Sequence, residues 1–444
     1  MPSQPSSLAA HLADKKLLLW GLGKEGASSY RFLRRHFPEK PLVLADANIA
    51  ALRADPKLAA DPHLECWDQD EAVARLDTFD LVLKGPGIPT AGLGLGKRAD
   101  RITGQADLFL KFATGRVVGI TGTKGKSTTS ALLRHLLVSA FGPDDVWLGG
   151  NFGVPLWDFI EKLGPESRTV AELSSYQLEY ARHAPTVAVW LNLYEEHLNY
   201  HGSLDAYRAA KANIVRHLPA SGHLVHRADD PGIVRALEEV GLRGASHPFD
   251  ADSEFPFSLQ GNRQLPGRHN RLNALAALRA ARLLGVPDEA FQPAFDSYAS
   301  LPHRLEYLGV VGGVRYYNDS ISTVPQATLA ALEALPETEV LLVGGMDRGI
   351  SYQPLADALV RRQGLRLLLL LPETGAIVGR LLKETGLPLP FPIREVESLE
   401  EAVALAKQTA RPGGVCLLSP AASSYHRYRN FEERGDAFRA LVKA

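Results

Sequence analysis

Cysteine is scarce in this sequence: Cys66 and Cys416 are the only two among 444 residues. Two cysteines so far apart exclude a disulfide-based scaffold and fit a reducing compartment such as the cytoplasm. The sequence also lacks an excess of charge of either sign, since its formal net charge is −1. This balance gives no bulk electrostatic reason to expect nucleic acid or an anionic membrane as a partner.

Long apolar runs are missing as well. The longest, such as residues 367–371, fall far short of the ~20 residues that cross a bilayer. The N-terminal residues lack the basic segment and apolar stretch of a signal peptide, so we interpret them as a frayed start. We therefore expect a cytoplasmic chain with no membrane insertion. Apolar residues make up 45% and charged residues 22%, which is the composition of an ordinary globular protein.

The chain is too long for one typical domain, and its pattern divides it into three segments. Each segment alternates short apolar runs with helical patterns such as residues 267–284, which predicts α/β domains with parallel sheets. The expected strands are residues 16–20, 41–45, 81–83, 116–120, 169–171, 186–191, 314–317, 339–343, 366–371 and 415–418. We predict domains over residues 1–113, 114–299 and 300–444, with a linker at residues 111–115.

The run Gly119-Ile-Thr-Gly-Thr-Lys-Gly-Lys-Ser-Thr-Thr129 stands between a strand-like and a helical segment. This is the layout of a phosphate-binding loop, in which backbone N–H groups close around phosphate oxygens. Lys126 would reach the terminal phosphates, and Ser127 or Thr128 would hold Mg²⁺. The residues expected to contact ATP here are Gly122, Thr123, Lys124, Gly125, Lys126, Ser127 and Thr128. The alternative is a glycine-rich turn without a ligand, because Ile120 stands where the standard pattern has its first glycine.

A second glycine pattern, Gly21-x-Gly23-x-x-Gly26, follows the first expected strand, and Asp46 stands about twenty residues further on. By spacing this is the dinucleotide fingerprint, which on its own favours an NAD-dependent dehydrogenase. The same glycines would serve the diphosphate of a uridine nucleotide at this helix end. A tight turn without a ligand is a third possibility. The dehydrogenase hypothesis leaves the phosphate-binding loop unexplained.

Other polar blocks also follow strand-like runs, and none of them establishes a function alone. Glu172 can hold Mg²⁺ beside the phosphate-binding loop, although a carboxylate also suits the first turn of a helix. A lone histidine such as His197 is usually structural, and Lys211 in an amphipathic helix is usually a solvated charge. Asp319 either binds a ribose or metal or belongs to a helix cap. A protein that merely switches on ATP binding would not bring Glu172, His197 and Lys211 together at the loop.

Taken together, these blocks resemble the Mur ligases of bacterial cell-wall synthesis, over nearly the whole chain and in the order of that family. The blocks are Thr121-Gly-Thr-x-Gly-Lys-Ser127, Gly149-Gly-Asn-x-Gly153, Glu172-Leu-Ser-Ser175, Asn192 to His197, Gly267-x-His-Asn-x-x-Asn273-Ala, Leu301-Pro-His-Arg304 and Asn318-Asp-Ser320. The residues Ser174 to Glu179 and Ser419 to Gly435 look like the glutamate-adding members. In this family the missing first glycine of the phosphate-binding loop is an expected trait.

The resemblance implies a Rossmann-like first domain for a UDP-sugar and a central P-loop ATPase-like domain with a mostly parallel sheet. The third domain is expected to be Rossmann-like and to bring the amino acid. The implied enzyme is an ATP-dependent amide ligase that adds glutamate to UDP-N-acetylmuramoyl-L-alanine. The substrate carboxylate attacks the γ-phosphate of ATP to give an acyl phosphate and ADP, and the glutamate amine then displaces phosphate. We expect a monomer.

Matched position by position, the resemblance assigns roles to individual residues. The expected catalytic residues are Lys126, His197 and Lys211, of which Lys211 is expected to be carbamylated. Two Mg²⁺ sites are expected, one held by Ser127 and Glu172 and the other by His197. Expected ATP contacts outside the loop are Asn273, Arg304 and Asp319. Expected UDP-sugar contacts are Gly21, Leu22, Gly23, Lys24, Asp46, Gly85, Gly87, Asn151, Ser174 and Gln177. Expected glutamate contacts are Thr323, Arg348, Ser424 and Phe431.

Departures from the family pattern bear on the substrates. Ile321 stands where family members commonly carry a lysine that contacts the glutamate carboxylate, while Arg348 can still clamp a carboxylate with two hydrogen bonds. D-glutamate is the expectation from the family, and L-glutamate is the alternative, since a variant ligase of this kind has a similar loop. Residues 46–48 lack the arginine that some members place near the UDP phosphates.

Overall fold

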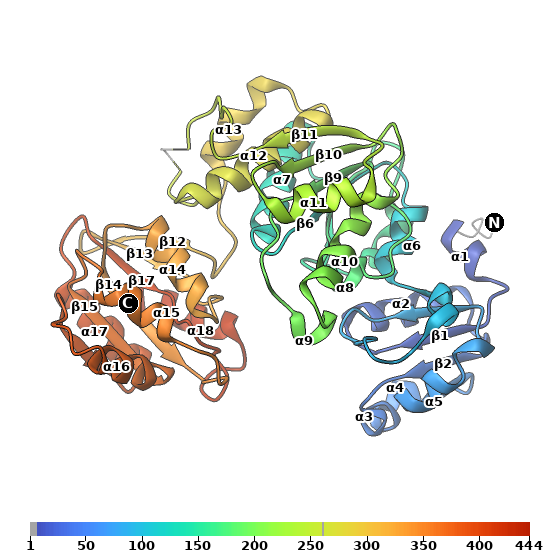
Figure 1. Cartoon of the computed structure of the whole chain (residues 1–444), viewed down its shortest axis with the longest axis horizontal. Coiled ribbons are helices and arrows are strands. Elements are labelled where there is room, and N and C mark those ends of the chain that lie inside the picture. The colour runs from blue at the N-terminus through green and yellow to red at the C-terminus, as the bar shows by residue number, and fades with distance from the viewer. Residues whose placement is uncertain (1–6, 260–261) are drawn as a thin grey trace. The chain divides into compact units, whose positions relative to one another are not determined.

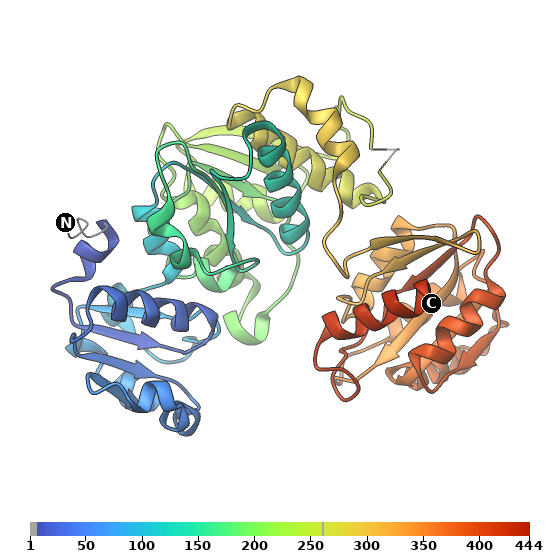
Figure 2. The same cartoon turned by 180° about the vertical axis from the view of Figure 1, so that it is seen from behind.

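The computed structural model describes residues 7–259 and 262–444 of an α/β protein with three separate β-sheets (Figures 1 and 2). Residues 1–6, expected to be a frayed start, lie outside the described residues. Contacts group the chain into two compact units, Met1–Pro256 with Leu272–Ala294 and Phe257–Arg271 with Phe295–Ala444. The first two sheets belong to the first unit and the third sheet to the second. No helix in the described part of the chain is long and apolar enough to cross a membrane.

The first sheet is fully parallel and has the strand order β3-β2-β1-β4-β5. Its strands are β1 (Leu17–Trp20), β2 (Leu42–Ala45), β3 (Leu64–Trp67), β4 (Leu81–Lys84) and β5 (Ile102–Thr103). The helices of this segment are α1 (Ser7–Leu12), α2 (Lys24–His36), α3 (Ile49–Ala54), α4 (Pro56–Ala59), α5 (Gln69–Ala74) and α6 (Gln105–Phe112). Every side chain of β1 is buried, as expected for a strand with helices on both faces.

The second sheet is also parallel, in the order β11-β10-β9-β6-β8-β7. Its strands are β6 (Arg116–Thr121), β7 (Val146–Gly150), β8 (Arg168–Glu172), β9 (Val187–Trp190), β10 (His223–Arg227) and β11 (Ala245–Phe249). Its helices are α7 (Lys126–Phe141), α8 (Ser175–Leu178), α9 (Leu198–His201), α10 (Leu204–Arg216), α11 (Pro231–Val240), α12 (Arg268–Leu283) and α13 (Phe291–Ser297), of which α12 and α13 run into the second unit.

The first and second sheets share an apolar core inside the first unit. One buried cluster contains Leu19 of β1 together with Trp190 of β9. At the junction the rings of Phe32 and Trp157 lie 5.1 Å apart. Because these contacts are apolar and continuous, the two sheets form one packed body on which a shared site can be built.

The third sheet has the order β12-β13-β17-β14-β15-β16. Its strands are β12 (Glu306–Val311), β13 (Val314–Asn318), β14 (Thr338–Gly345), β15 (Leu367–Glu373), β16 (Ile393–Glu395) and β17 (Val415–Leu418). Its helices are α14 (Pro325–Ala334), α15 (Gln353–Val360), α16 (Thr374–Glu384), α17 (Leu399–Thr409) and α18 (Phe431–Lys443). Only the β12–β13 pair is antiparallel among the strand pairs of the described residues. Separate apolar clusters cover the two faces of the sheet, one including α14 to α16 and the other α17 and α18.

The ten expected strands and the helix over residues 267–284 are confirmed, with ends shifted by a few residues. The expected linker at residues 111–115 is wrong in its first part, because α6 continues to Phe112. The sequence pattern also missed several strands, such as β10 and β11, which carry histidine, arginine or proline between apolar residues. Parallel backbone pairing holds these strands in place despite their polar side chains, since β10 pairs with both β9 and β11.

Gly26 lies in the first turn of α2, where the helix packs closely against the turn that follows β1. A Cβ atom there would lie 2.0 Å from the carbonyl oxygen of Gly21, so a Gly26→Ala substitution must move backbone. We expect a free energy of unfolding lower by about 1–3 kcal/mol, measured by chemical denaturation. Gly87→Ala is the matched control, because a Cβ there meets nothing within 4 Å. Equal stability of the two variants would contradict this packing.

Candidate active site at the phosphate-binding loop

The glycine loop joins β6 to the N-terminus of α7, as the sequence predicts. Gly125 precedes the helix with φ +85°, a left-handed conformation that glycine adopts without strain. A Cβ on Gly125 would also lie 2.4 Å from Oδ1 of Asn273, so α12 packs directly on the loop. Nζ of Lys126 donates to the carbonyl oxygens of Gly122 (2.8 Å) and Thr123 (3.0 Å). The lysine therefore lies back over its own loop, where phosphate oxygens would be held.

Asn192 holds the loop from the neighbouring strand end. Its Oδ1 accepts from the backbone N–H of Lys124 (2.8 Å), and its Nδ2 donates to the Lys124 carbonyl (3.0 Å). The hydroxyl of Thr123 lies 2.9 Å from the hydroxyl of Tyr207 on α10. Neither Asn192 nor Tyr207 was assigned a role from the sequence, although Asn192 begins one of the blocks that carry the resemblance. These contacts hold the loop backbone from the end of β9 and from α10.

Glu172 is the last residue of β8 and not a helix N-terminal acid, and its side chain is 1% exposed. In the sheet it pairs with Ile120, directly before the loop. Oε1 accepts a hydrogen bond from Nδ2 of Asn151 (2.7 Å), whereas the buried Oε2 has no hydrogen-bond partner among the described residues. A buried carboxylate oxygen without a partner is costly unless a cation or donor joins it.

This donor set fits Mg²⁺. The described residues contain no group of three or more His, Cys, Asp or Glu side chains that could hold a metal ion. Mg²⁺ does not need such a cage, since it commonly takes one or two carboxylates with phosphate oxygens and water. Glu172 and the hydroxyl of Ser127, at the second position of α7, supply oxygens of the right kind. Because Glu172 lies beside the loop, its free oxygen is available to a cation that also binds phosphate.

Lys211 on α10 is buried, not solvated: it is 1% exposed. Its Nζ donates to the carbonyl oxygen of Gly122 (2.9 Å) and lies 3.4 Å from Oγ1 of Thr121. Burial lowers the pKa of its ammonium well below the ordinary lysine value, and the charge of Lys126 adds to this. The amine of Lys211 is therefore neutral more often than that of an ordinary lysine, and it lies against Gly122 of the phosphate-binding loop.

His197 lies at the N-terminus of α9 in a left-handed conformation with φ +59°. Its ring packs on Tyr176, with centroids 5.0 Å apart. Burial lowers the pKa of the imidazole, and the charges of Lys126 and Lys211 lower it further against the opposing effect of Glu196. A neutral imidazole is the form that binds metal. Glu172, His197 and Lys211 thus all come from the strand ends and helices around the loop.

The predicted UDP-sugar residues of the first segment gather at the carboxyl ends of β1, β2 and β4. One Asp46 oxygen accepts from the backbone N–H of Leu22 (3.0 Å), which ties the end of β2 to the glycine turn. The N–H of Gly85 donates to the carbonyl of Trp20 (2.7 Å). Gly23 is the N-cap of α2 and has no side-chain cap, so the helix N-terminus stays available to an anion. Lys24 follows it, and Gly87 lies in the loop after β4.

Two polar links that sequence reasoning missed join the first segment to the second. Nε2 of Gln177 donates to Oε1 of Glu25 (2.5 Å), and burial raises the pKa of the Glu25 carboxyl to about 7. Lys84, 5% exposed, pairs with Glu179 at 3.2 Å. Ser174 and Gln177 form a capping box on α8, which orients the Gln177 side chain. The expected sugar-binding residues of α8 are therefore held against the first segment.

The remaining predicted residues lie in the second unit. Asp319 follows β13 and is buried; its oxygens accept from the hydroxyls of Ser322 (2.5 Å) and Ser419 (2.8 Å), and burial raises its pKa to about 6. Nε of Arg304 is buried and has no hydrogen-bond partner in the part of the chain that the structure describes. Ser424 lines a cavity of about 380 Å³ in this unit. Thr323 precedes α14, Arg348 lies in the loop after β14, and Phe431 begins α18.

The first unit has the architecture of an enzyme that uses a nucleoside triphosphate: a phosphate-binding loop, a buried carboxylate with a free oxygen, and a buried lysine around one strand end. Residues 120–281 match the Mur ligase middle domain. The chain is 34% identical to the UDP-N-acetylmuramoylalanine–D-glutamate ligase of Geobacillus kaustophilus, over 96% of each chain. It is 37% identical to the UDP-N-acetylmuramoyl-L-alanine–L-glutamate ligase of Xanthomonas campestris, over 98% of this chain and 96% of that one.

A solved structure, the MurF ligase of Thermotoga maritima in complex with ADP, shares the fold with a TM-score of 0.61, at 18% identity over 99% of both chains. On the sequence similarity, the chain belongs to the Mur ligase family. It is an ATP-dependent amide ligase with the mixed α/β fold of that family. The dehydrogenase hypothesis is therefore wrong, and so is that of an ATP-switched binding protein.

Proposed function

We propose that this chain adds glutamate to UDP-N-acetylmuramoyl-L-alanine in peptidoglycan synthesis and forms ADP and phosphate. The observation that carries the proposal is the convergence of Lys126, Glu172 and Lys211 at one loop, in a chain that is 34% and 37% identical to glutamate-adding relatives. Both substrates named here, ATP and a UDP-sugar, are cytoplasmic metabolites, which supports a cytoplasmic location. We retain the expectation of a monomer.

The proposed division of labour follows the three segments 1–113, 114–299 and 300–444, each of which contains one complete sheet. The strand ends of the first segment hold the UDP group, with Gly21 to Lys24, Asp46, Gly85 and Gly87. Asn151, Ser174 and Gln177 contact the sugar-peptide side. Asn273 contacts ATP from α12, which already packs on the loop. Arg304 and Asp319 of the third segment are the further proposed ATP contacts. Thr323, Arg348, Ser424 and Phe431 are the proposed glutamate contacts.

In the first step the substrate carboxylate attacks the γ-phosphorus and ADP leaves, giving an acyl phosphate. The loop N–H groups and Lys126 orient the phosphates and stabilise negative charge on the transferring group. Ser127 and Glu172 would hold one Mg²⁺ and His197 a second, and these ions would supply charge neutralisation. In the second step the glutamate amine attacks the acyl carbon, and the phosphate leaves as the amide bond forms.

Lys211 is proposed to carry a carbamate. Its amine is buried against the loop, and its lowered pKa increases the neutral fraction. A neutral amine adds to CO₂ and releases a proton, which turns a buried cation beside Lys126 into an anion. The exchange would relieve the repulsion between two lysines and give His197 and the metal site an anionic neighbour.

D-glutamate is the acceptor expected from the family, and L-glutamate is the second candidate. Two observations favour the L-isomer: Ile321 removes the usual carboxylate-binding lysine, and an L-glutamate-adding relative is 37% identical. The experiment is phosphate release with ATP, Mg²⁺, UDP-N-acetylmuramoyl-L-alanine and each glutamate isomer. We expect release with one isomer and a clear preference over the other. Absence of release with both isomers would overturn the proposed function.

A further inference from the structure

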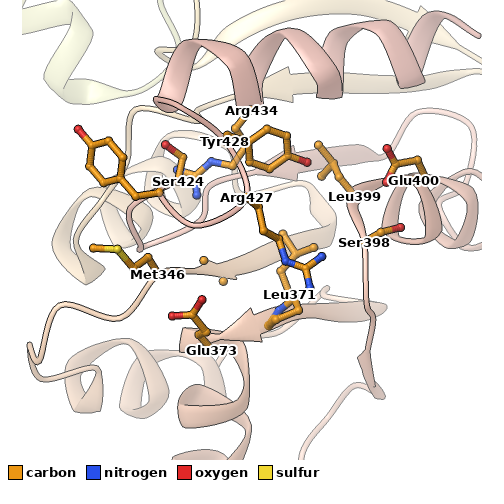
Figure 3. Close-up of a pocket in the computed structure, with 14 residues that line it drawn as sticks. Met346, Leu371, Glu373, Ser398, Leu399, Glu400, Ser424, Arg427, Tyr428 and Arg434 are labelled. Atoms are coloured by element: carbon orange, nitrogen blue, oxygen red, sulfur yellow. The ribbon is translucent and has the colours of Figure 1, made fainter.

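A crevice opens at the carboxyl end of the third sheet, within the second unit (Figure 3). Its volume is about 380 Å³, which suits a small molecule. The loops that line it leave β14 and β15 toward α15 and α16 on one face, and β16 and β17 toward α17 and α18 on the other. Parallel α/β sheets bind their ligands at such a point, outside the strand ends.

Backbone strain concentrates around the same crevice. Glu373, which lines it, has φ +61° and ψ −95°. His426 has φ +81° and Ala421 φ +58°, both in the segment between β17 and α18. These are three of the six non-glycine residues with positive φ in the described chain. Strained non-glycine residues cost free energy and cluster at functional sites.

The lining carries charges of both signs. Arg427 is exposed and extends into the crevice from the β17–α18 segment (Figure 3). Its Nη1 donates to the carbonyl of Glu397. Glu373 accepts from Nδ1 of His426 at 3.0 Å. Glu400 lies in the first turn of α17, whose N-terminus borders the crevice. A lining with arginines and carboxylates suits a zwitterion better than it suits a dinucleotide with two phosphates.

The inner wall holds a second cation. Arg434 is 2% exposed and donates to four neutral oxygens: Oγ and the carbonyl of Ser320, and the carbonyls of Ala422 and Ser423. No salt bridge joins it to a carboxylate among the described residues, and burial lowers its pKa to about 10. A buried guanidinium without an anion makes the potential at the wall positive. Ser320 directly precedes Ile321, where the usual lysine is missing.

We propose that this crevice binds the side-chain carboxylate of the incoming glutamate, with Arg427 as its direct partner and Arg434 as the buried charge behind it. The inference rests on the proposed function and adds the residue that replaces the missing lysine. The amine of glutamate must remain outside the crevice to attack the acyl phosphate. The α-carboxylate is attached to the same carbon as the amine, so it stays near the crevice mouth. The side-chain carboxylate is therefore the group that reaches furthest in. A guanidinium matches a carboxylate with two parallel hydrogen bonds.

The test compares Arg427→Gln with Arg429→Gln. Arg429 lies two residues further on, its side chain is 86% exposed, and it pairs with Glu433 outside the crevice lining. We expect Arg427→Gln to raise the KM for glutamate about tenfold or more, whereas Arg429→Gln changes it less than about twofold. Arg427→Gln should also reduce the preference for glutamate over glutamine, because the lost charge no longer rejects a neutral amide. Arg427→Lys should recover part of both effects.

A second assay separates this inference from the proposed function. Hydroxylamine replaces glutamate and traps the acyl phosphate as a hydroxamate, so its reaction does not need the crevice. For Arg427→Gln we expect wild-type rates of hydroxamate formation together with the raised KM for glutamate. A glutamate KM and glutamine preference equal to those of Arg429→Gln would overturn the crevice assignment. Wild-type protein that forms hydroxamate but never uses glutamate would overturn the proposed acceptor itself.

Discussion

Lys126→Ala should lower ATP-dependent phosphate release by about 10³-fold or more. Nζ of Lys126 lies over the loop, bonded to the carbonyls of Gly122 and Thr123. When phosphates fill the loop, the same ammonium is in position to contact the transferring group. Removing it withdraws charge stabilisation that is strongest in the transition state. The loss should therefore appear in kcat and in kcat/KM together.

The controls for this variant distinguish chemistry from folding. Lys162→Ala removes an exposed lysine of the same unit and should keep wild-type rates. Lys126→Ala should still be stabilised by the UDP-sugar in a thermal-shift assay, since the sugar site of the first segment does not include Lys126. A Lys126→Ala enzyme within about tenfold of wild-type activity would contradict the assigned role.

The phosphate-binding loop could be predicted because its signal is local. Strand, glycines, Lys126, Ser127 and helix are contiguous in sequence, and the structure keeps them contiguous. The glycines at positions 122 and 125 have the positive φ values that the loop requires. The strand-end position of Glu172 was also predictable, because a β-like run immediately precedes it.

Partners far apart in the chain could not be predicted in this way. Asn192 is 68 residues from the loop backbone that it holds, and Gln177 is 152 residues from Glu25. No local sequence pattern indicates which residues so far apart come into contact, because such contacts depend on how the strands are ordered in the sheet. The crevice of the third sheet is a similar case, since its lining comes from four separate strand ends.

Lys211 shows most clearly where local reasoning fails. Its helix is amphipathic, and a lysine in such a helix is ordinarily placed on the solvated face. In the structure α10 instead turns this residue inward, 1% exposed, toward the loop. Burying an ammonium near a second lysine is unfavourable without compensation. The proposed carbamate would relieve this repulsion, because it replaces the cation by an anion.

Lys211→Ala should reduce phosphate release by about 10²-fold, and a short carboxylate such as formate should restore part of it. The truncation leaves a space beside Gly122 and Thr121 that a small anion can enter. The anion would stand in for the carbamate, so recovery should saturate with its concentration. Chloride at equal ionic strength should give no recovery.

Lys211→Met is the matched variant, because it fills the same volume with an apolar chain. It should fold with a Tm near or above that of the wild type, since a buried charge is replaced by a packed side chain. It should be as inactive as Lys211→Ala and should not respond to formate, because no space remains for the anion. Full activity of Lys211→Ala without any carboxylate would contradict the proposed carbamate on Lys211. Equal recovery of both variants with formate would show that formate acts at another place in the protein.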